Sequence, residues 1–353
     1  MVKELNGPDR QPGGHGLTLV PQPQHRRHTM RAVVQHGYGG PEVLGVEEVP
    51  LPSPGARQVL VQVHAAGVDR GTDHLMTGKP YAARLALGLR RPRQPVAGRD
   101  VAGTVVAVGA EVTGYAVGDE VYGVAPGSFA EYAVGPEAKL APKPAGLPFA
   151  EAAAVPISGG TALQALAAGR VRAGQSVLVL GASGGVGSFA VQLAKAAGAE
   201  VTGVCGTAKQ EFVRSLGADH VLDHTRSDFA DGTRQWDVIL DIGGSPSLQR
   251  LRRALKPGGT VVFVGGEGGG NVTGLGRQLR GALLSPLRKQ RMVLLVAKER
   301  ASDYERLAEL IGEGSVAPRV DRSYPLEEAA EALRRLRAGD VQGKLVLTVV
   351  PAG

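Results

Sequence analysis

The 353-residue sequence is poor in cysteine, in aromatic residues and in long apolar runs. Its one cysteine, Cys205, excludes an internal disulfide and every zinc site built from several cysteines. Tyrosine, phenylalanine and tryptophan number only seven, six and one, so platforms for stacking nucleic-acid bases are scarce. The arginines behind the net charge of +7 are scattered along the chain, which argues against a nucleic-acid-binding surface.

The sequence also lacks any apolar run near the ~18 residues that a membrane span requires, and its N-terminus has no apolar segment behind a basic start. A lone cysteine is compatible with a reducing compartment. These absences predict a cytoplasmic protein that does not bind a membrane. The modest positive charge of the chain favours an anionic small molecule as its ligand over a nucleic acid.

Glycine, by contrast, is abundant, and the 52 glycines indicate many tight turns and close backbone approaches. A chain longer than the ~250–300 residues of a single core is expected to form two domains. Residues 1–29 are rich in proline, glycine and polar residues and predict a flexible leader, so the fold is expected to begin at Met30. Short β-type runs separated by Pro/Gly turns then follow at Arg31–Gln35, Gln58–Ala65 and Gly103–Val108.

From about Phe149 onward helical segments alternate with apolar strands, which is typical of βαβ units in a parallel sheet. The expected strands are Ser176–Leu180, Glu200–Cys205, His220–Leu222, Val238–Asp241 and Thr260–Val264. The expected helices between them are Val186–Ala197, Lys209–Leu216 and Pro246–Ala254. Two amphipathic helices, Ser302–Glu313 and Leu326–Ala338, precede a last strand, Lys344–Val349, which we expect to return to the first domain.

A glycine-rich turn joins the first of these strands to its helix. The turn consists of Gly181, Ala182, Ser183, Gly184, Gly185, Val186 and Gly187. Strand, glycine turn and helix in that order form the context in which such a motif indicates dinucleotide binding, because backbone N–H groups and the helix N-terminus can meet a pyrophosphate. The alternative is a glycine turn needed for packing alone.

The end of the next strand decides which nicotinamide cofactor is expected. An NAD site places an acidic residue there, on the ribose hydroxyls. Here the strand runs into Gly206, Thr207, Ala208 and Lys209, and the first carboxylate is Glu211, inside the expected helix. We therefore predict NADP(H), with Lys209 placed to meet the 2′-phosphate; a solvated lysine at a helix N-terminus is the alternative.

Several separate motifs resemble those of one enzyme family. They are Ala66–Asp69, Pro95–Gly103 followed by Val108–Gly109, Val117–Val121, the glycine turn, and Gly343–Lys344. In this order they resemble the medium-chain dehydrogenase/reductase superfamily, in its zinc-free quinone oxidoreductase and enoyl reductase branch, over nearly all of Met30 to Val349. The resemblance implies a GroES-like β-rich catalytic domain, a Rossmann-type doubly wound parallel sheet domain, an α/β fold overall, a cleft between the domains, and a homodimer.

The implied domains are 30–157 for the catalytic domain, 158–298 for the NADP-binding domain and 299–353 for a return to the catalytic domain. By the same resemblance Thr161 would lie against the nicotinamide, and Thr207, Lys209 and His224 would surround the 2′-phosphate, although a histidine replaces the tyrosine usual in the last position. The residues implied to line the rest of the cofactor are Ile242, Gly243, Gly265, Leu295, Val296 and Ala297.

Zinc is not expected. At the ligand positions of zinc-dependent relatives this sequence places Asp69 and Arg99, and the cysteines of a structural zinc loop do not exist. A guanidinium repels a metal ion, and a catalytic zinc needs about three protein ligands. Without a Lewis acid, hydride transfer is expected to favour a quinone or an α,β-unsaturated carbonyl, which delocalises the arriving charge onto oxygen.

Three polar residues are candidates for contacting the substrate or the nicotinamide ribose. Asp69 is the strongest; as a carboxylate it could hold a hydroxyl but would oppose an oxyanion. Asp73 either lines the cleft or caps a helix, and Tyr81 either donates to a carbonyl or is an ordinary half-buried tyrosine. No proton donor stands out, and solvent can serve.

The sequence thus predicts a zinc-independent, NADPH-dependent oxidoreductase acting on a small quinone or enone. One alternative is an enoyl or acyl-thioester reductase of a biosynthetic pathway, in which Arg84, Arg90, Arg91 and Arg93 meet a phosphate-bearing carrier; the other reading of these residues is a solvated loop. The second alternative is a non-catalytic NADP-binding sensor. The glycines Gly265, Gly266, Gly268, Gly269 and Gly270 suggest a mobile loop of the kind that often gates a site; the alternative is a disordered surface loop.

Overall fold

The computed structural model describes residues 28–244, 246–265, 276 and 290–349. Most of the expected leader, at residues 1–27, and the glycine-rich segment from Gly266 to Gly270 lie outside the described residues. Among the residues that are described, no helix is long and apolar enough to cross a membrane.

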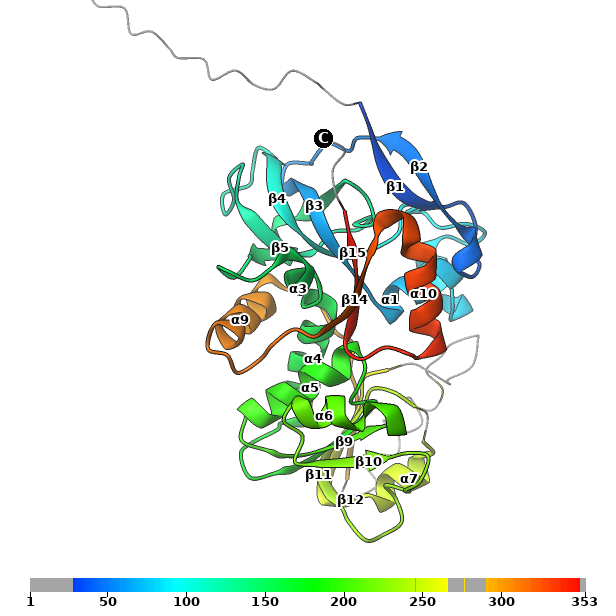
Figure 1. Ribbon diagram of the computed structural model, residues 1–353, viewed down its shortest axis with the longest axis vertical. Coiled ribbons are helices and arrows are strands. Elements are labelled where there is room, and N and C mark those ends of the chain that lie inside the picture. The colour runs from blue at the N-terminus through cyan, green and yellow to red at the C-terminus, as the bar shows by residue number, and fades with distance from the viewer. Residues whose placement is uncertain (1–27, 245, 266–275, 277–289, 350–353) are drawn as a thin grey trace, which may run out of the picture.

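The first half of the chain forms a mostly antiparallel sheet that takes its last two strands from the C-terminal segment (Figure 1). The sheet has seven strands, in the order β14-β15-β3-β4-β5-β7, with β6 also paired to β3. They are β3 (Gln58–Val68), β4 (Asp100–Val108), β5 (Glu120–Val124), β6 (Tyr132–Pro136), β7 (Leu140–Pro142), β14 (Val320–Pro325) and β15 (Lys344–Thr348). Two further strands, β1 (Thr29–Gln35) and β2 (Leu44–Pro50), form an antiparallel ribbon beside it.

The second sheet is wholly parallel and has six strands, in the order β10-β9-β8-β11-β12-β13. They are β8 (Ser176–Leu180), β9 (Glu200–Cys205), β10 (His220–Asp223), β11 (Trp236–Asp241), β12 (Leu255–Phe263) and β13 (Arg291–Leu294). The chain winds outward from β8 in one direction and from β11 in the other. A switch in winding direction between these two strands is where such sheets bind ligands, beyond the carboxyl ends of the strands.

Helices pack against both sheets, and those between the two sheets join them (Figure 1). They are α1 (Arg70–Thr77), α2 (Arg84–Leu87), α3 (Phe149–Ala153), α4 (Pro156–Gly169), α5 (Gly185–Ala196), α6 (Gln210–Ser215), α7 (Leu248–Arg253), α9 (Ala301–Gly312) and α10 (Ala329–Ala338). Short 3₁₀ segments are η1 (Pro41–Val43), η2 (Tyr81–Ala83), η3 (Glu137–Lys139), η4 (Thr207–Lys209) and η5 (Leu326–Glu328).

The central helix α4 is buried because small residues let its neighbours approach. An added Cβ at Gly159 would lie 3.0 Å from Leu307 of α9, and one at Gly160 would lie 3.4 Å from the Tyr304 ring. One hydrophobic core contains residues of α4, α5, α9 and both sheets, Tyr122 of β5 and Val179 of β8 among them. The two sheets are therefore joined by continuous apolar packing.

The C-terminal strand lies in the first sheet. β15 pairs antiparallel with β3, with Leu345 opposite Val68, and β14 pairs parallel with β15. The parallel sheet is thus an insertion between strands of the first sheet, and the segment from α9 to β15 packs along both.

Candidate functional site

The glycine turn after β8 has an irregular backbone that only its glycines permit. Gly181 has φ +82°, and an added Cβ there would lie 2.8 Å from the backbone of Gly243, which follows β11. A Cβ at Gly187 would lie 2.1 Å from the carbonyl oxygen of Gly181. These two positions therefore bring β8, β11 and the start of α5 into direct backbone contact, as a Rossmann turn requires.

Gly184, which precedes α5, differs from these packing positions. Its extended backbone, at φ −83° and ψ 179°, would leave an added Cβ with Gly181 O at 3.7 Å as its one neighbour within 4 Å among the described residues. Gly184, Gly185 and Val186 are half-buried, whereas Ala182, Ser183 and Gly187 are buried. The rim of the turn is thus an open backbone surface at the N-terminus of a 12-residue helix, where the macrodipole favours an anion.

Two other strand ends meet this turn. An added Cβ at Gly265, beyond β12, would lie 2.2 Å from the carbonyl oxygen of Ile242, and the Gly265 N–H donates to Asp241 O at 3.2 Å. Leu295, just after β13, donates its N–H to Phe263 O at 3.0 Å. The carboxyl ends of β8, β11, β12 and β13 therefore converge, and with them the predicted residues Ile242, Gly243, Gly265 and Leu295. Val296 is 73% exposed, and Thr161 lies half-buried in α4.

The predicted phosphate residues at the end of β9 have other partners. The hydroxyl of Thr207 donates to Asp223 Oδ2 at 2.5 Å. The ammonium of Lys209 donates to the carbonyls of Gly339 and Val341, in the connection between α10 and β15. Lys209 thus ties the parallel sheet to the C-terminal segment.

Asp223 is a residue that sequence reasoning missed. It ends β10 opposite Cys205 of β9, is 6% exposed, and accepts hydrogen bonds from Thr207 and Thr225 that hold its pKa at about 2. His224, beside it, is exposed, with Nε2 3.6 Å from an added Cβ at Gly206. The sequence signal that could have placed this carboxylate is its position directly after the predicted strand His220–Leu222, because neighbouring parallel strands end at the same edge of a sheet.

Asp69 follows the end of β3 and caps α1. Its Oδ1 accepts the N–H of Thr72 at 2.7 Å, and the side chain is buried. Among the described residues Oδ2 has no hydrogen-bond partner. One carboxylate oxygen is therefore committed to the fold and the other is not.

Arg99 lies close to Asp69 but pairs elsewhere. An added Cβ at Gly71 would lie 2.9 Å from Asp69 Oδ1 and 3.6 Å from an Arg99 nitrogen. The Arg99 guanidinium forms an ion pair with Glu299, whose second oxygen is 2.6 Å from Lys139 Nζ. These side chains are 22% to 40% exposed, so the charges lie in a partly open site between the two sheets.

These residues do not fit a zinc ion. At the two positions that correspond to zinc ligands, Asp69 is a helix-capping carboxylate and Arg99 is held in an ion pair. Within the described ranges no three His, Cys, Asp or Glu side chains are grouped so that they could hold a metal.

The remaining candidates, Asp73 and Tyr81, have partners within the first domain. Asp73 is buried in the first turn of α1 and accepts from Arg337 Nε at 2.5 Å. The alternative that it caps the helix is wrong, because Asp69 takes that role. Tyr81 is 44% exposed, with the guanidinium of Arg84 4.8 Å from its ring centroid.

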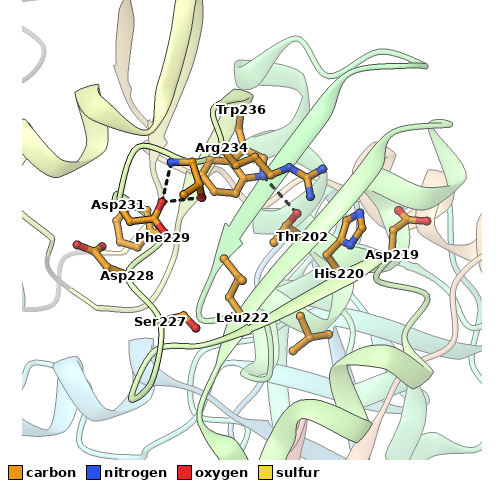
Figure 2. A pocket seen from close by; sticks show the side chains of 12 residues that line it. Thr202, Asp219, His220, Leu222, Ser227, Asp228, Phe229, Asp231, Arg234 and Trp236 are labelled. Carbon is orange, nitrogen blue, oxygen red and sulfur yellow. Dashed lines mark hydrogen bonds between the residues drawn. The ribbon is translucent and has the colours of Figure 1, made fainter.

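A pocket of about 420 Å³ lies at the outer edge of the parallel sheet, by β10 (Figure 2). Trp236 and Phe229 contribute aromatic surface, and Trp236 Nε1 donates to Thr202. Its acidic side chains have partners: Asp228 pairs with Arg250 at 2.7 Å. None of the predicted site residues lines it, so this pocket is separate from the converging strand ends.

Two family models match the chain and define its class. The "Alcohol dehydrogenase GroES-like domain" model matches residues 55–145, and the "Zinc-binding dehydrogenase" model matches residues 216–347. The fold and these matches define a two-domain dehydrogenase.

Comparison with similar proteins indicates which dehydrogenases the chain resembles. The chain is 33% identical over 338 residues to the quinone oxidoreductase of Mus musculus, covering 90% of this chain and 97% of that protein. It is 33% identical to the NADPH-dependent alkenal/one oxidoreductase of Arabidopsis thaliana, covering 91% and 80%. The solved quinone oxidoreductase of Coxiella burnetii superposes with a TM-score of 0.81 at 29% identity, covering 91% and 100%.

The chain belongs to the medium-chain dehydrogenase/reductase superfamily, in its quinone oxidoreductase branch. It is an oxidoreductase that uses a nicotinamide cofactor. The resemblance seen in the sequence and the predicted fold class are confirmed. The word zinc in the description of one family model is not matched by the residues at Asp69 and Arg99.

Proposed function

We propose that this chain transfers a hydride from NADPH to a small quinone or α,β-unsaturated carbonyl without zinc. The observation that carries the proposal is the pair of features at the interface of the two sheets: an open backbone rim at Gly184, and an arginine, Arg99, where a metal ligand would stand. The names of the Mus musculus and Arabidopsis thaliana relatives support both acceptor classes.

In this proposal the bound cofactor supplies the hydride, and the chain supplies position and electrostatics. The N–H groups at Gly185 and Val186 hold the pyrophosphate, and Thr161 and residues 295–297 lie beside the nicotinamide. The uncommitted Oδ2 of Asp69 accepts a hydroxyl of the ribose or the substrate. The guanidinium of Arg99 stabilises negative charge arriving on the acceptor oxygen, and a proton from solvent completes the reduction.

The preference for NADPH rests on the end of β9, where Gly206 and Thr207 stand in place of an acidic residue. The relative named as NADPH-dependent supports it. We further propose a homodimer in the cytoplasm, from the family resemblance and the single cysteine.

The test is oxidation of NADPH and of NADH by chelator-treated protein, with a small quinone and an enone as parallel acceptors. We expect turnover with at least one acceptor, and a rate that the chelator leaves unchanged. Tight NADPH binding with no turnover would support the non-catalytic sensor instead. A rate lost to chelation and restored by zinc would contradict the proposal.

The loop after β13 provides a second test. Glu299 joins it to Arg99 and Lys139, and Gln164 of α4 accepts the Lys298 N–H at 3.0 Å. Glu299→Gln is expected to raise the KM for NADPH about 3- to 10-fold, because the loop carrying residues 295–297 loses its ionic contacts, each worth up to ~1 kcal/mol.

The matched control is Glu111→Gln, which breaks an exposed ion pair with Arg57 far along the first sheet. We expect its KM for NADPH to equal that of the wild type. Equal KM values for both variants and the wild type would show that the Glu299 contacts do not position the cofactor loop.

The carrier-substrate alternative gains little from the arginine loop. Arg84 donates to the carbonyls of Thr77 and Gly78 and lies over two tyrosine rings, and Arg93 donates to Ala86 O. Both side chains thus have structural contacts within the first domain.

A further inference from the structure

Asp223 lies where the adenosine ribose of the cofactor would meet the protein. In a Rossmann unit the residue that follows the second strand contacts the 2′ position of that ribose. Here the second strand is β9, and the parallel register puts Asp223 beside Cys205, its last residue. Thr207, two residues beyond Cys205, donates to Asp223. The end of β9 has no acidic residue of its own, but the carboxylate of Asp223, from the neighbouring strand β10, lies beside it.

The carboxylate is held by four donors. Oδ2 accepts from the Thr207 hydroxyl at 2.5 Å and from Gln210 Nε2 at 3.3 Å. Oδ1 accepts from the hydroxyl of Thr225 at 2.7 Å and from its N–H at 2.9 Å. These hydrogen bonds hold the pKa of Asp223 at about 2, so the group is ionised and can only accept.

A hydroxyl has a single proton to donate. Because Thr207 and Thr225 both donate theirs to Asp223, each presents only lone pairs to a ligand. A ribose 2′-hydroxyl can donate to such an oxygen. A 2′-phosphate cannot, because near neutral pH it is largely a dianion whose oxygens accept.

The cations nearby do little to offset this charge. Lys209 already donates to the carbonyls of Gly339 and Val341. Arg226 Nε is 3.9 Å from Asp223 Oδ2, but its side chain is 76% exposed and therefore well screened. The surroundings of Thr207 suit a donor ligand better than an anionic one.

We propose that Asp223 determines cofactor specificity. It accepts the protons of both threonine hydroxyls and adds a negative charge, which stabilises the bound ribose diol of NADH. It thereby reduces the preference for NADPH that follows from the missing acidic residue at the end of β9. This inference rests on the proposed function, and it makes the wild-type protein an oxidoreductase of both cofactors. Removing the charge at Asp223 should therefore increase the preference for NADPH over NADH.

The test is Asp223→Asn, which keeps the shape of the side chain. An amide NH₂ directed at Thr207 releases the threonine hydroxyl to donate to a phosphate. We expect the ratio of kcat/KM for NADPH to that for NADH to rise about 10-fold, mainly through the KM for NADPH; tenfold corresponds to about 1.4 kcal/mol.

Asp231→Asn is the matched control. Asp231 accepts from the N–H of Thr233 at 2.8 Å and from its hydroxyl at 2.7 Å, in the same local turn that Asp223 forms with Thr225, but it is exposed and lies by the outer pocket. We expect its cofactor ratio to match the wild type. An unchanged ratio in Asp223→Asn, or an equal rise in both variants, would overturn the inference.

A binding measurement separates this inference from the proposed reaction. Titration calorimetry with 2′,5′-ADP and with 5′-ADP needs no acceptor; Asp223→Asn should bind 2′,5′-ADP about 10-fold more tightly than wild type, with 5′-ADP unchanged or weaker. That result without turnover of any acceptor would sustain the role of Asp223 and refute the proposed function. Loss of discrimination between the two nucleotides in the wild type and both variants would overturn the inference.

A second variant guards against misfolding of Asp223→Asn. Thr207→Val removes the oxygen that would accept the ribose hydroxyl, and it leaves Thr225 on Asp223. We expect a rise of several-fold in the KM for NADH and little change for NADPH. A larger rise for NADPH than for NADH would mean that Thr207 donates to the phosphate, and would contradict the proposal.

Discussion

Replacing Gly187 by alanine is expected to weaken NADPH binding about 100-fold, a loss of the size that a displacement near 1 Å can cause. The added Cβ would lie 2.1 Å from the carbonyl oxygen of Gly181 and 2.8 Å from Ala182 Cα. Both are backbone atoms of the turn and cannot rotate away. The N-terminus of α5 must therefore move from β8, and the N–H groups around Gly184 move with it. Calorimetric titration of NADPH measures the effect.

The control for this substitution is Gly312→Ala at the end of α9. Apart from the backbone of its own helix and its chain neighbours, the described part of the chain has no atom within 4 Å of an added Cβ there, and its φ lies outside the left-handed region. NADPH affinity should stay at the wild-type value, and the melting temperature should stay the same or rise slightly, because alanine is the better helix former. If Gly187→Ala bound NADPH as tightly as Gly312→Ala does, the turn would not be the pyrophosphate site.

Replacing Lys344 by methionine is expected to lower the free energy of unfolding by about 3 kcal/mol at pH 8. The Lys344 ammonium is 3.0 Å from Asp100 Oδ2, and the two side chains are 2% and 0% exposed. Asp100 also accepts the Ile157 N–H, at the start of α4, at 2.8 Å. Without Lys344 the carboxylate is a buried charge with no cation, the costliest way to break such a pair. Denaturant unfolding without cofactor is the measurement.

The size of this loss depends on pH in a defined direction. Burial raises the pKa of Asp100 from 3.8 to about 6 even with Lys344 present, and removing the ammonium raises it further. Since the folded pKa lies above the unfolded one, the cost of the buried carboxylate is absent below pH ~4 and grows as pH rises through 6. The deficit of Lys344→Met should therefore be largest at pH 8 and shrink toward pH 5.

Two further variants isolate the buried pair. Asp100→Asn combined with Lys344→Met removes both charges and keeps an acceptor for Ile157, so it should recover at least half of the lost stability. Lys195→Met breaks a partly exposed pair with Asp219, and about 1 kcal/mol or less is expected. A deficit that stayed constant from pH 5 to 8 would show that the charge on Asp100 is not its cause.

The parallel sheet was predictable where a short apolar run is enclosed by turn residues. Strands β8 and β9 have the bounds that the sequence predicted, Ser176–Leu180 and Glu200–Cys205, because each run is buried along nearly its whole length. Strand β12 begins at Leu255, five residues before the predicted Thr260, since Leu255 pairs with Trp236 across a break in register. Strand β13 was not predicted, because its four residues gain their conformation by pairing with β12.

At the site, the sequence predicted correctly those positions that depend only on the course of the backbone. The turn at Gly181, which the strand–turn–helix pattern indicated, lies against the strand end at Gly243, and Gly265 lies against Ile242, as the family resemblance implied. The hydrogen-bond partners of the side chains were not predicted from the sequence. Lys209 donates to carbonyls 130 and 132 residues away, a contact that depends on the whole fold. The N-cap at Asp69 rather than Asp73 likewise depends on where α1 begins, which a short polar segment does not specify.

The order of the strands in the first sheet has a consequence for synthesis on the ribosome. Strand β3 has Leu345 opposite Val68 and Val346 opposite Gly67, so this edge of the sheet stays unpaired until β15 has emerged. The six-stranded parallel sheet, ending at Leu294, is complete earlier and has its partners close along the chain. A nascent chain can therefore assemble the nucleotide-binding half first. The catalytic half, whose strands are made first, is completed last.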